Sequence, residues 1–239
     1  MDDDRRAFLT ELLTTPTPSG YEAVGQRAWL DYVRAFADDV WTDDYGNAVA
    51  VHEGGGPSIA FGGHGDEIGY IVRDITDDGF LRLGSIGGAD RTVSKGQHVT
   101  VHAETPVAGV IGQTAIHLRE PDDESHQDIA EQFVDVGADD GDEAASLVDV
   151  GDPVTVETRV RPLHGTRMAA RGMDNRVGIW AAAEGLRAAA AADVDATVYA
   201  VSTVQEEVGI QGAKMVGFEL DPDAAVAIDV THATDNPDI

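Results

Sequence analysis

Four short motifs carry histidine or carboxylate side chains at the point where an apolar run ends. They are GGHGDEIGY (62–70), GMDNRVG (172–178), VSTVQEEVG (201–209) and VAIDVTHATD (226–235). Three of the apolar runs read as buried strands of an α/β protein, and ligands bind at the carboxyl edge of such sheets. The chain has no cysteine, so a metal site would have to use imidazole and carboxylate ligands. The candidate residues are His64, Asp66, Asp174, Glu206, Glu207 and Asp229.

The first two motifs each have a structural alternative. His64 and Asp66 alternate along an extended segment, which suits a metal-binding imidazole whose other nitrogen is held by a carboxylate. A core histidine satisfied by hydrogen bonds explains the same pair equally well. Asp174 stands where a helix is expected to begin, and taken alone it is better explained as a helix N-cap.

The last two motifs differ in how strongly they indicate a site. Glu206 and Glu207 follow a run that should be fully buried, where adjacent carboxylates are costly unless a cation neutralises them. Asp229 also ends an apolar strand, but a solvated loop acid is a reasonable alternative in so acidic a chain. Taken together, the motifs predict a site for divalent metal, dinuclear with a bridging aspartate.

The elements that position these residues follow from hydrophobic periodicity. Helical spacing indicates two opening helices, with Ser19 as a candidate N-cap between them. Residues 68–162 change to short β-type pieces separated by Gly, Pro and Asp, which predicts an inserted small β-barrel or β-sandwich. Its segment 120–131 is too polar for a core and is expected to be an exposed loop. After residue 162 the strand–helix alternation predicts an α/β fold with a mainly parallel sheet flanked by helices.

Charge and composition narrow the class of protein. The chain has 44 acidic and 16 basic residues, a net charge of -28, yet 42% hydrophobic residues. Self-repulsion at this density is screened in concentrated salt, so we expect a halophilic, cytoplasmic protein. The same field disfavours nucleic acid as a partner. The N-terminal sequence does not look like a signal peptide, and no apolar run is long enough to span a membrane.

The motifs GHGDEIGYIV, GMDNRVG, TVQEEVGIQGA and AIDVTHATDNP resemble, in order and spacing, those of the tetrahedral aminopeptidases, also called glutamyl or deblocking aminopeptidases. The resemblance spans the whole chain, β insert included. It implies an enzyme that removes N-terminal residues from short peptides and binds two metal ions, usually zinc or cobalt. It also implies a catalytic domain of residues 1–67 and 163–239, and a dimerisation domain of residues 68–162 within a homo-oligomer of twelve subunits.

The resemblance assigns a role to each candidate. His64, Asp174 and Asp229 would bind one metal ion, and Asp174 and Glu207 the other. Glu206 would be the general base that takes a proton from the attacking water and returns it to the leaving amine. Asp66 would orient His64.

This sequence departs from the family pattern in one respect. Family chains continue beyond this length and supply a last histidine ligand, whereas this chain stops at Ile239. His232 is interpreted as a loop residue. We therefore expect one metal site to lack a ligand, and the isolated chain to be less stable than longer relatives and weakly active or inactive.

Two alternatives remain open. One is another metal-dependent amidohydrolase, such as a deacylase or carboxypeptidase. The other is an inactive subunit with a role in assembly through its β insert.

Overall fold

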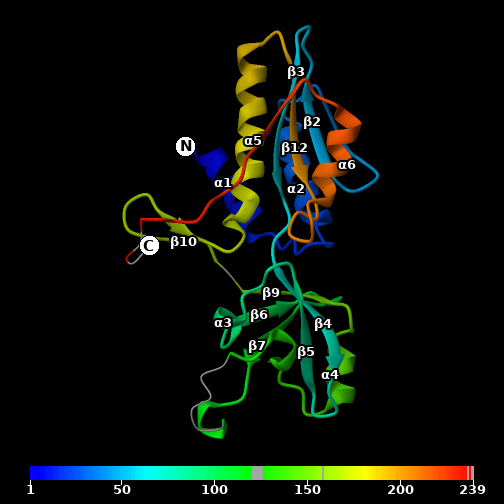
Figure 1. Cartoon of the computed structure of the whole chain (residues 1–239), viewed down its shortest axis with the longest axis vertical. Coiled ribbons are helices and arrows are strands. Elements are labelled where there is room, and N and C mark those ends of the chain that lie inside the picture. The colour runs from blue at the N-terminus through cyan, green and yellow to red at the C-terminus, as the bar shows by residue number, and fades with distance from the viewer. Residues whose placement is uncertain (120–125, 158, 236, 238–239) are drawn as a thin grey trace. The chain divides into compact units, whose positions relative to one another are not determined.

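The computed structural model describes residues 1–119, 126–157, 159–235 and 237. The chain divides into two compact units, drawn in Figure 1. Unit 1 contains Met1–Glu67 and Arg159–Ile239, and unit 2 contains Ile68–Thr158. In the part of the chain that the structure describes, no helix combines the length and apolarity needed to cross a membrane.

The centre of unit 1 is a five-stranded sheet. Its spatial order is β1 (Asp39–Thr42), β2 (Ala48–His52), β12 (Thr197–Thr203), β3 (Ser58–His64) and β13 (Ala224–Ala227). Strands β12 and β13 run parallel to β3, whereas β1 with β2 and β2 with β12 are antiparallel. The sheet is therefore mixed. The β1–β2 pair has to be antiparallel, since a short turn joins these two strands. The predicted α/β class with an inserted barrel is confirmed.

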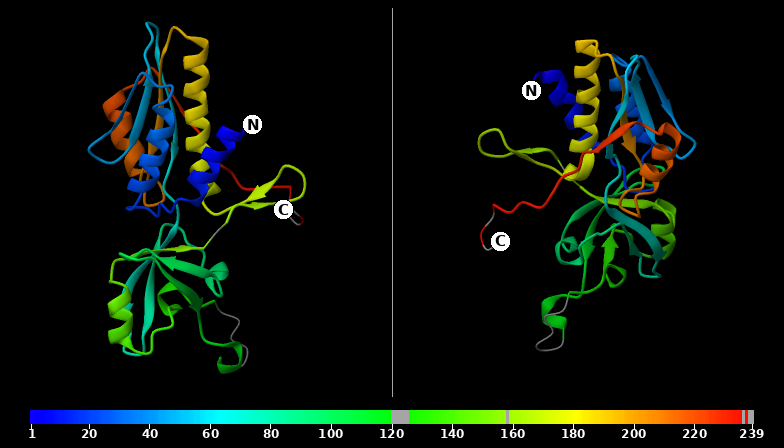
Figure 2. Two further views of the ribbon diagram at one scale, coloured as in Figure 1. Left: turned by 180° about the vertical axis from the view of Figure 1, so that it is seen from behind. Right: turned by 45° about the horizontal axis from the view of Figure 1, so that its top comes forward.

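Helices cover both faces of this sheet, as Figure 2 shows for α5 and α6. On one face, α2 (Ala23–Val33) and α5 (Met173–Ala192) pack against the sheet around Trp29 and Leu186, and α1 (Asp3–Thr14) packs on these two helices. On the other face, α6 (Gln211–Leu220) places Val216 against Val49 and Val201. Successive side chains of a strand point to opposite faces of the sheet. Because helices cover both faces, the side chains of β2 and most of those of β12 are buried.

The parallel pairing of β3 with β12 is the feature that builds the site. In their register, His64 lies opposite Thr203, so both strands end at the same edge of the sheet. The motifs that follow these strands are separated by about 140 residues, yet they begin side by side. Strand β13 ends two residues before Asp229 and pairs with β3 on its other side.

Unit 2 is a closed antiparallel barrel with its own core. The strands follow the order β4 (Gly69–Ile75), β5 (Phe80–Ile86), β8 (Phe133–Asp135), β7 (Val107–Gly112), β6 (His98–Val101) and β9 (Pro153–Val156). Inward side chains such as Val72, Leu83 and Val134 are fully buried. Short helices α3 (Arg91–Ser94) and α4 (Gly141–Leu147) and the turns Ile116–Leu118 and Ile129–Glu131 complete the unit.

The segment expected to be an exposed loop, residues 120–131, is only partly described by the structure. Residues 120–125 of the expected exposed loop lie outside the described residues, and Ile129 of the same segment is buried in the barrel core. Unit 1 also contains a short ribbon of β10 (Arg161–Pro162) and β11 (Met168–Ala169), which leads into α5.

Candidate metal centre

His64 is the last residue of β3 and lies at the middle of a cluster of carboxylates. Its side chain is 3% exposed. Nδ1 lies 3.3 Å from Oδ1 of Asp66, and Nε2 lies 3.1 Å from Oδ1 of Asp174. Burial alone would lower the pKa of His64, but the hydrogen bond and charge of Asp66, with Glu206 and Asp174, raise it to about 9. In the absence of metal, a proton therefore supplies the positive charge that these carboxylates require.

Asp66 is completely buried and its two carboxylate oxygens are saturated with donors. Besides contacting His64, it accepts hydrogen bonds from Ser19 Oγ at 2.5 Å and from the backbone N–H groups of Glu206 at 3.0 Å and Glu207 at 3.1 Å. Although burial opposes ionisation, hydrogen bonds from His64, Ser19 and Glu206 hold the pKa of Asp66 below its usual value. An ionised Asp66 orients the imidazole and also fixes the turn that follows β12.

Asp174 lies in the first turn of α5, but its side chain does not cap the helix. The backbone at Asp174 and Asn175 is not helical, and the Asp174 carboxylate, about 61% exposed, faces His64. Asn175 supplies the local capping instead, because its side-chain oxygen accepts the Gly178 N–H at 3.0 Å. Its side-chain nitrogen donates to the Ile228 carbonyl at 2.8 Å and ties α5 to the segment that carries Asp229.

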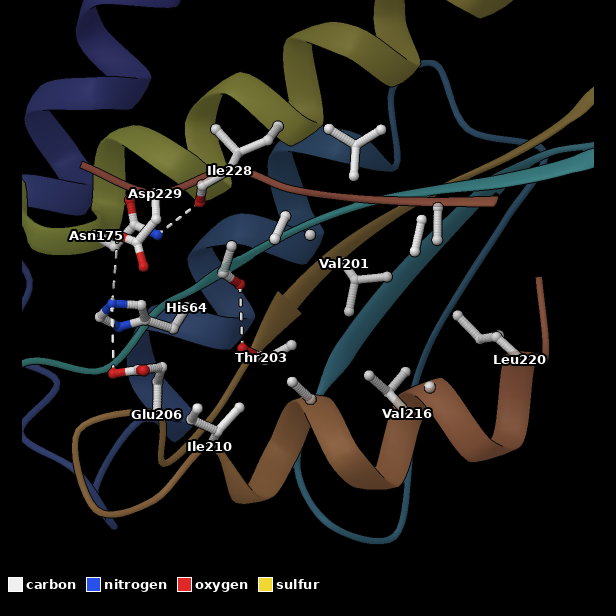
Figure 3. Close-up of a pocket in the computed structure, with 18 of the residues that line it drawn as sticks. His64, Asn175, Val201, Thr203, Glu206, Ile210, Val216, Leu220, Ile228 and Asp229 are labelled. Carbon is white, nitrogen blue, oxygen red and sulfur yellow. Dashed lines mark hydrogen bonds and ion pairs between the residues drawn. The ribbon is translucent and has the colours of Figure 1, made fainter. Parts of the chain in front are cut away.

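Glu206 and Glu207 follow β12, and Figure 3 shows Glu206 on the side of the imidazole that faces away from α5. Glu206 Oε2 lies 3.8 Å from His64 Nε2. Ligand atoms of His64, Asp174 and Glu207 all lie within 4.8 Å of one another. Desolvation and the neighbouring carboxylates raise the pKa of Glu207 to about 7, against the opposing effect of His64. The two adjacent acids therefore differ in their surroundings. Glu207 belongs to the group formed with His64 and Asp174, and Glu206 lies beside this group.

Asp229 lies at the rim of the cluster. Its Oδ1 is 4.0 Å from His64 Nε2, and its side chain is half-exposed. Figure 3 shows His64, Glu206 and Asp229 at one end of a groove of about 320 Å³ that continues between α6 and β13. The groove walls are mostly apolar and include Val216 and Ile228. His232 is exposed.

The donor set fits a divalent cation. It combines one imidazole nitrogen with several carboxylate oxygens, the ligand types that zinc and cobalt take in proteins. Desolvation is the main cause that raises the pKa of Glu207, and repulsion from the neighbouring carboxylates adds to it, whereas the pKa of His64 is raised by these carboxylates against the effect of desolvation. A bound cation would remove that repulsion and allow both groups to act in their deprotonated forms.

Sequence reasoning missed three residues that hold this site together. Ser19, expected as an N-cap, instead hydrogen-bonds Asp66, and Glu22 takes the N-cap position of α2 without a side-chain cap. The buried Glu22 carboxylate accepts the N–H groups of Gly20 at 2.9 Å and Gln205 at 3.1 Å, and burial raises its pKa. Asn175 is the third. Asn175 lies within the motif GMDNRVG, which was a signal, but Ser19 and Glu22 lie far before the first motif and their partners are distant in the chain, so nothing local marked them.

The chain is similar in sequence and in fold to known aminopeptidases. The family model of the M42 glutamyl aminopeptidases matches residues 46–239. A putative aminopeptidase of Acetivibrio thermocellus is 34% identical over 92% of this chain, and the lysyl aminopeptidase of Pyrococcus furiosus is 32% identical over 95%. The solved TET aminopeptidase of a marine sediment archaeon (Thaumarchaeota) superposes on 99% of this chain with a TM-score of 0.95 at 31% identity.

The relatives are longer than this chain. The match covers 64% of the Acetivibrio protein, 66% of the Pyrococcus furiosus protein and 68% of the thaumarchaeal structure. Within the matched part, the agreement in fold extends across both units, and the family model begins before His64 and includes all six candidate residues. On this match the chain belongs to the M42 glutamyl aminopeptidase family.

Proposed function

We propose that this chain carries the catalytic site of a metal-dependent aminopeptidase that removes N-terminal residues from short peptides. The observation that carries the proposal is the convergence of His64, Asp174 and Glu207 within 4.8 Å, with Glu206 beside them, in a chain of the M42 family. Each of the three residues comes from a different segment of unit 1, and only folding brings them together.

The residues have separate roles in this proposal. His64, Asp174, Glu207 and Asp229 would hold two divalent ions, zinc or cobalt, with Asp174 shared between them. Bound ions would supply Lewis acidity, which polarises the peptide carbonyl and activates water. Glu206 would accept a proton from water and deliver it to the leaving amine, and its side chain lines the groove, where a substrate can reach it.

Asp66 acts behind the imidazole. Its carboxylate contacts Nδ1 of His64, which leaves Nε2 directed at Asp174 and the open side of the site. A histidine that binds metal through one nitrogen is commonly held by a carboxylate at the other, and this fixes its tautomer and ring orientation.

The deciding experiment compares peptides that differ only at their ends. With added Co²⁺ or Zn²⁺, the proposal expects weak but measurable hydrolysis of a short peptide with a free N-terminus and none of its N-acetylated form. Glu206→Gln should bind Co²⁺ as the parent does but lose turnover by at least a hundredfold. Equal hydrolysis of both peptides, release of C-terminal residues, or removal of the acetyl group would favour a carboxypeptidase or deacylase instead.

We also propose that the chain forms a homo-oligomer through unit 2. The support is the closed barrel of Ile68–Thr158, inserted into unit 1 with a core of its own, together with a solved relative, PhTET1-12s, described as a dodecamer. That relative superposes on this chain with a TM-score of 0.86 at 32% identity. Replacing residues 68–158 by a short Gly/Ser linker should then reduce the mass measured by light scattering to that of a monomer. A monomeric parent with no bound metal would favour an inactive protein.

A further inference from the structure

Glu67 and Arg176 form a buried ion pair immediately behind the candidate metal centre. Nη2 of Arg176 lies 2.8 Å from Oε1 of Glu67, and each side chain is 1% exposed. Among the described residues, Arg176 Nη1 and Glu67 Oε2 have no hydrogen-bond partner. Burying two charges with part of their hydrogen-bonding capacity unused costs free energy, so a pair of this kind is weak evidence for stabilisation. Its position in the chain suggests another role.

The pair joins the two segments that supply His64 and Asp174. Glu67 follows directly after Asp66 in the loop beyond β3, and Arg176 lies two residues after Asp174 in α5. The ion pair is therefore a direct tie between the end of β3 and the start of α5. The hydrogen bond from His64 Nε2 to Asp174, 3.1 Å long, spans the same two segments on the side of the metal centre.

Further hydrogen bonds extend this tie to the main chain. Arg176 Nη2 donates to the Thr15 carbonyl at 3.0 Å and also to Thr17 Oγ1. Thr17 in turn donates through its hydroxyl to the Gly65 carbonyl at 2.6 Å and through its N–H to Glu67 at 3.0 Å. Gly65 lies between His64 and Asp66, so the guanidinium is linked through Thr17 to the peptide that carries both residues.

Arg171 anchors the other side of Asp174. It lies three residues before Asp174, and Nη1 donates to the same Oε1 of Glu67 that Arg176 contacts. The chain on both sides of Asp174 is therefore attached to one carboxylate oxygen. This matters because the backbone at Asp174 is not helical and regular helix hydrogen bonds do not fix its position.

We propose that Glu67, with Arg171 and Arg176, is a positioning group that sets the separation of His64 and Asp174 and thereby the affinity of the site for metal. The proposal rests on the proposed function only in treating His64 and Asp174 as metal ligands. None of the three side chains needs to contact the metal or the substrate. Groups behind a metal site typically change metal affinity by about 10- to 100-fold when removed.

The test replaces the whole buried group by apolar side chains of similar length, Glu67→Met with Arg171→Met and Arg176→Met, because Arg171 also pairs with Glu67 and would otherwise keep a buried charge without this carboxylate. Such replacements commonly keep the fold, so positioning and stability can be separated. The matched control is Arg5→Met with Glu184→Met, which removes an ion pair of 2.7 Å between α1 and α5 at a distance from the site. For each protein, Co²⁺ affinity is measured by competition with a chelator, and crystal structures without metal give the distance from His64 Nε2 to Asp174.

We expect the Glu67/Arg171/Arg176 triple variant to melt near the parent temperature without metal, to bind Co²⁺ at least about tenfold more weakly, and to show a changed His64–Asp174 distance. The control should keep the parent affinity and distance. Arg176→Lys keeps the charge but loses the Nη2 group that donates to Thr15 and Thr17. It should give a smaller loss, and it serves as the test if the triple variant does not fold.

The two proposals fail in different ways. If the parent itself binds no Co²⁺, the proposed function is wrong, while the distance measured without metal still tests the positioning role. If the folded variant keeps both the distance near 3.1 Å and the parent affinity, the positioning role is overturned and the pair is only structural.

Discussion

Ser19 and Asp66 are joined by a hydrogen bond of 2.5 Å between side chains that are both buried. Ser19 lies in the loop between α1 and α2, 47 residues before Asp66. Through this contact the N-terminal helices hold the carboxylate that orients His64 and receives the N–H groups of Glu206 and Glu207. The N-terminal segment is thus part of the machinery that positions the proposed site, although it contributes no metal ligand.

Ser19→Ala should weaken Co²⁺ binding several-fold, because Asp66 loses one of the donors that stabilise its charge. A hydrogen bond to a buried charged group is worth about 1.5 to 3 kcal/mol. Chelator competition measures the affinity. Ser58→Ala is the matched control, since Ser58 hydrogen-bonds the exposed Asp223 at 3.0 Å, away from the cluster. Equal effects of the two substitutions would contradict the role given to Ser19.

Asp174→Asn should reduce metal occupancy while leaving the stability of the metal-free protein nearly unchanged. A ligand shared between two cations needs its full charge, and the Asp174 carboxylate faces His64 and not the helix backbone. Metal content after dialysis measures the first effect and thermal melting the second. Asp193→Asn, at the other end of α5, is the control. Unchanged occupancy with a lowered melting temperature would return Asp174 to the role of a helix cap.

Metal affinity should rise with pH between about 6.5 and 9. His64 has a pKa raised to about 9 without metal, and a protonated imidazole must lose that proton before it can bind an ion. Glu207, raised to about 7, adds to the dependence at the lower end of this range. Co²⁺ titrations at several pH values measure the slope. A flat profile would show that His64 is already neutral.

The stability of the metal-free protein should change with pH in the opposite direction. Because the pKa of His64 is higher in the folded state than the ordinary value of 6.5, its contribution is fully present below 6.5 and is lost as pH rises through 9. Urea denaturation in the presence of EDTA at pH 6.5 and pH 9, compared with the same measurement on His64→Gln, isolates this contribution. Equal pH dependence in the two proteins would contradict it.

We propose that the protein works in concentrated salt, and we expect its free energy of unfolding to rise with KCl from 0.05 M to above 1 M. A net charge of -28 destabilises the compact state by self-repulsion, and salt screens this repulsion over a few ångströms. Urea denaturation suits the measurement because urea is uncharged. A cytoplasm of high ionic strength is the compartment that fits this behaviour. No gain in stability with KCl would remove the argument for halophily.

The sequence by itself determined the fold class and where along the chain chemistry could occur. Period-two runs and helical spacing are local, so the inserted barrel and the helices α1, α2 and α5 could be predicted from neighbouring residues. The motif residues could be predicted for a similar reason. A carboxylate such as Glu206 just after an apolar run can be recognised from the neighbouring residues in the sequence. The likeness of the motifs to a known family was confirmed by comparison. Their individual roles stay predictions.

Tertiary structure alone decided which residues meet. Two of the four pairings in the sheet are antiparallel. The hairpin of β1 and β2 is local, but the pairing of β2 with β12 arises because β12 lies between β2 and β3, an order that no local pattern specifies. Ser19 hydrogen-bonds Asp66 instead of capping a helix, and Glu67 pairs with Arg176, 109 residues away. Propensity and periodicity act over a few residues, whereas these contacts arise only when the parallel pairing of β3 and β12 brings distant loops to one edge of the sheet.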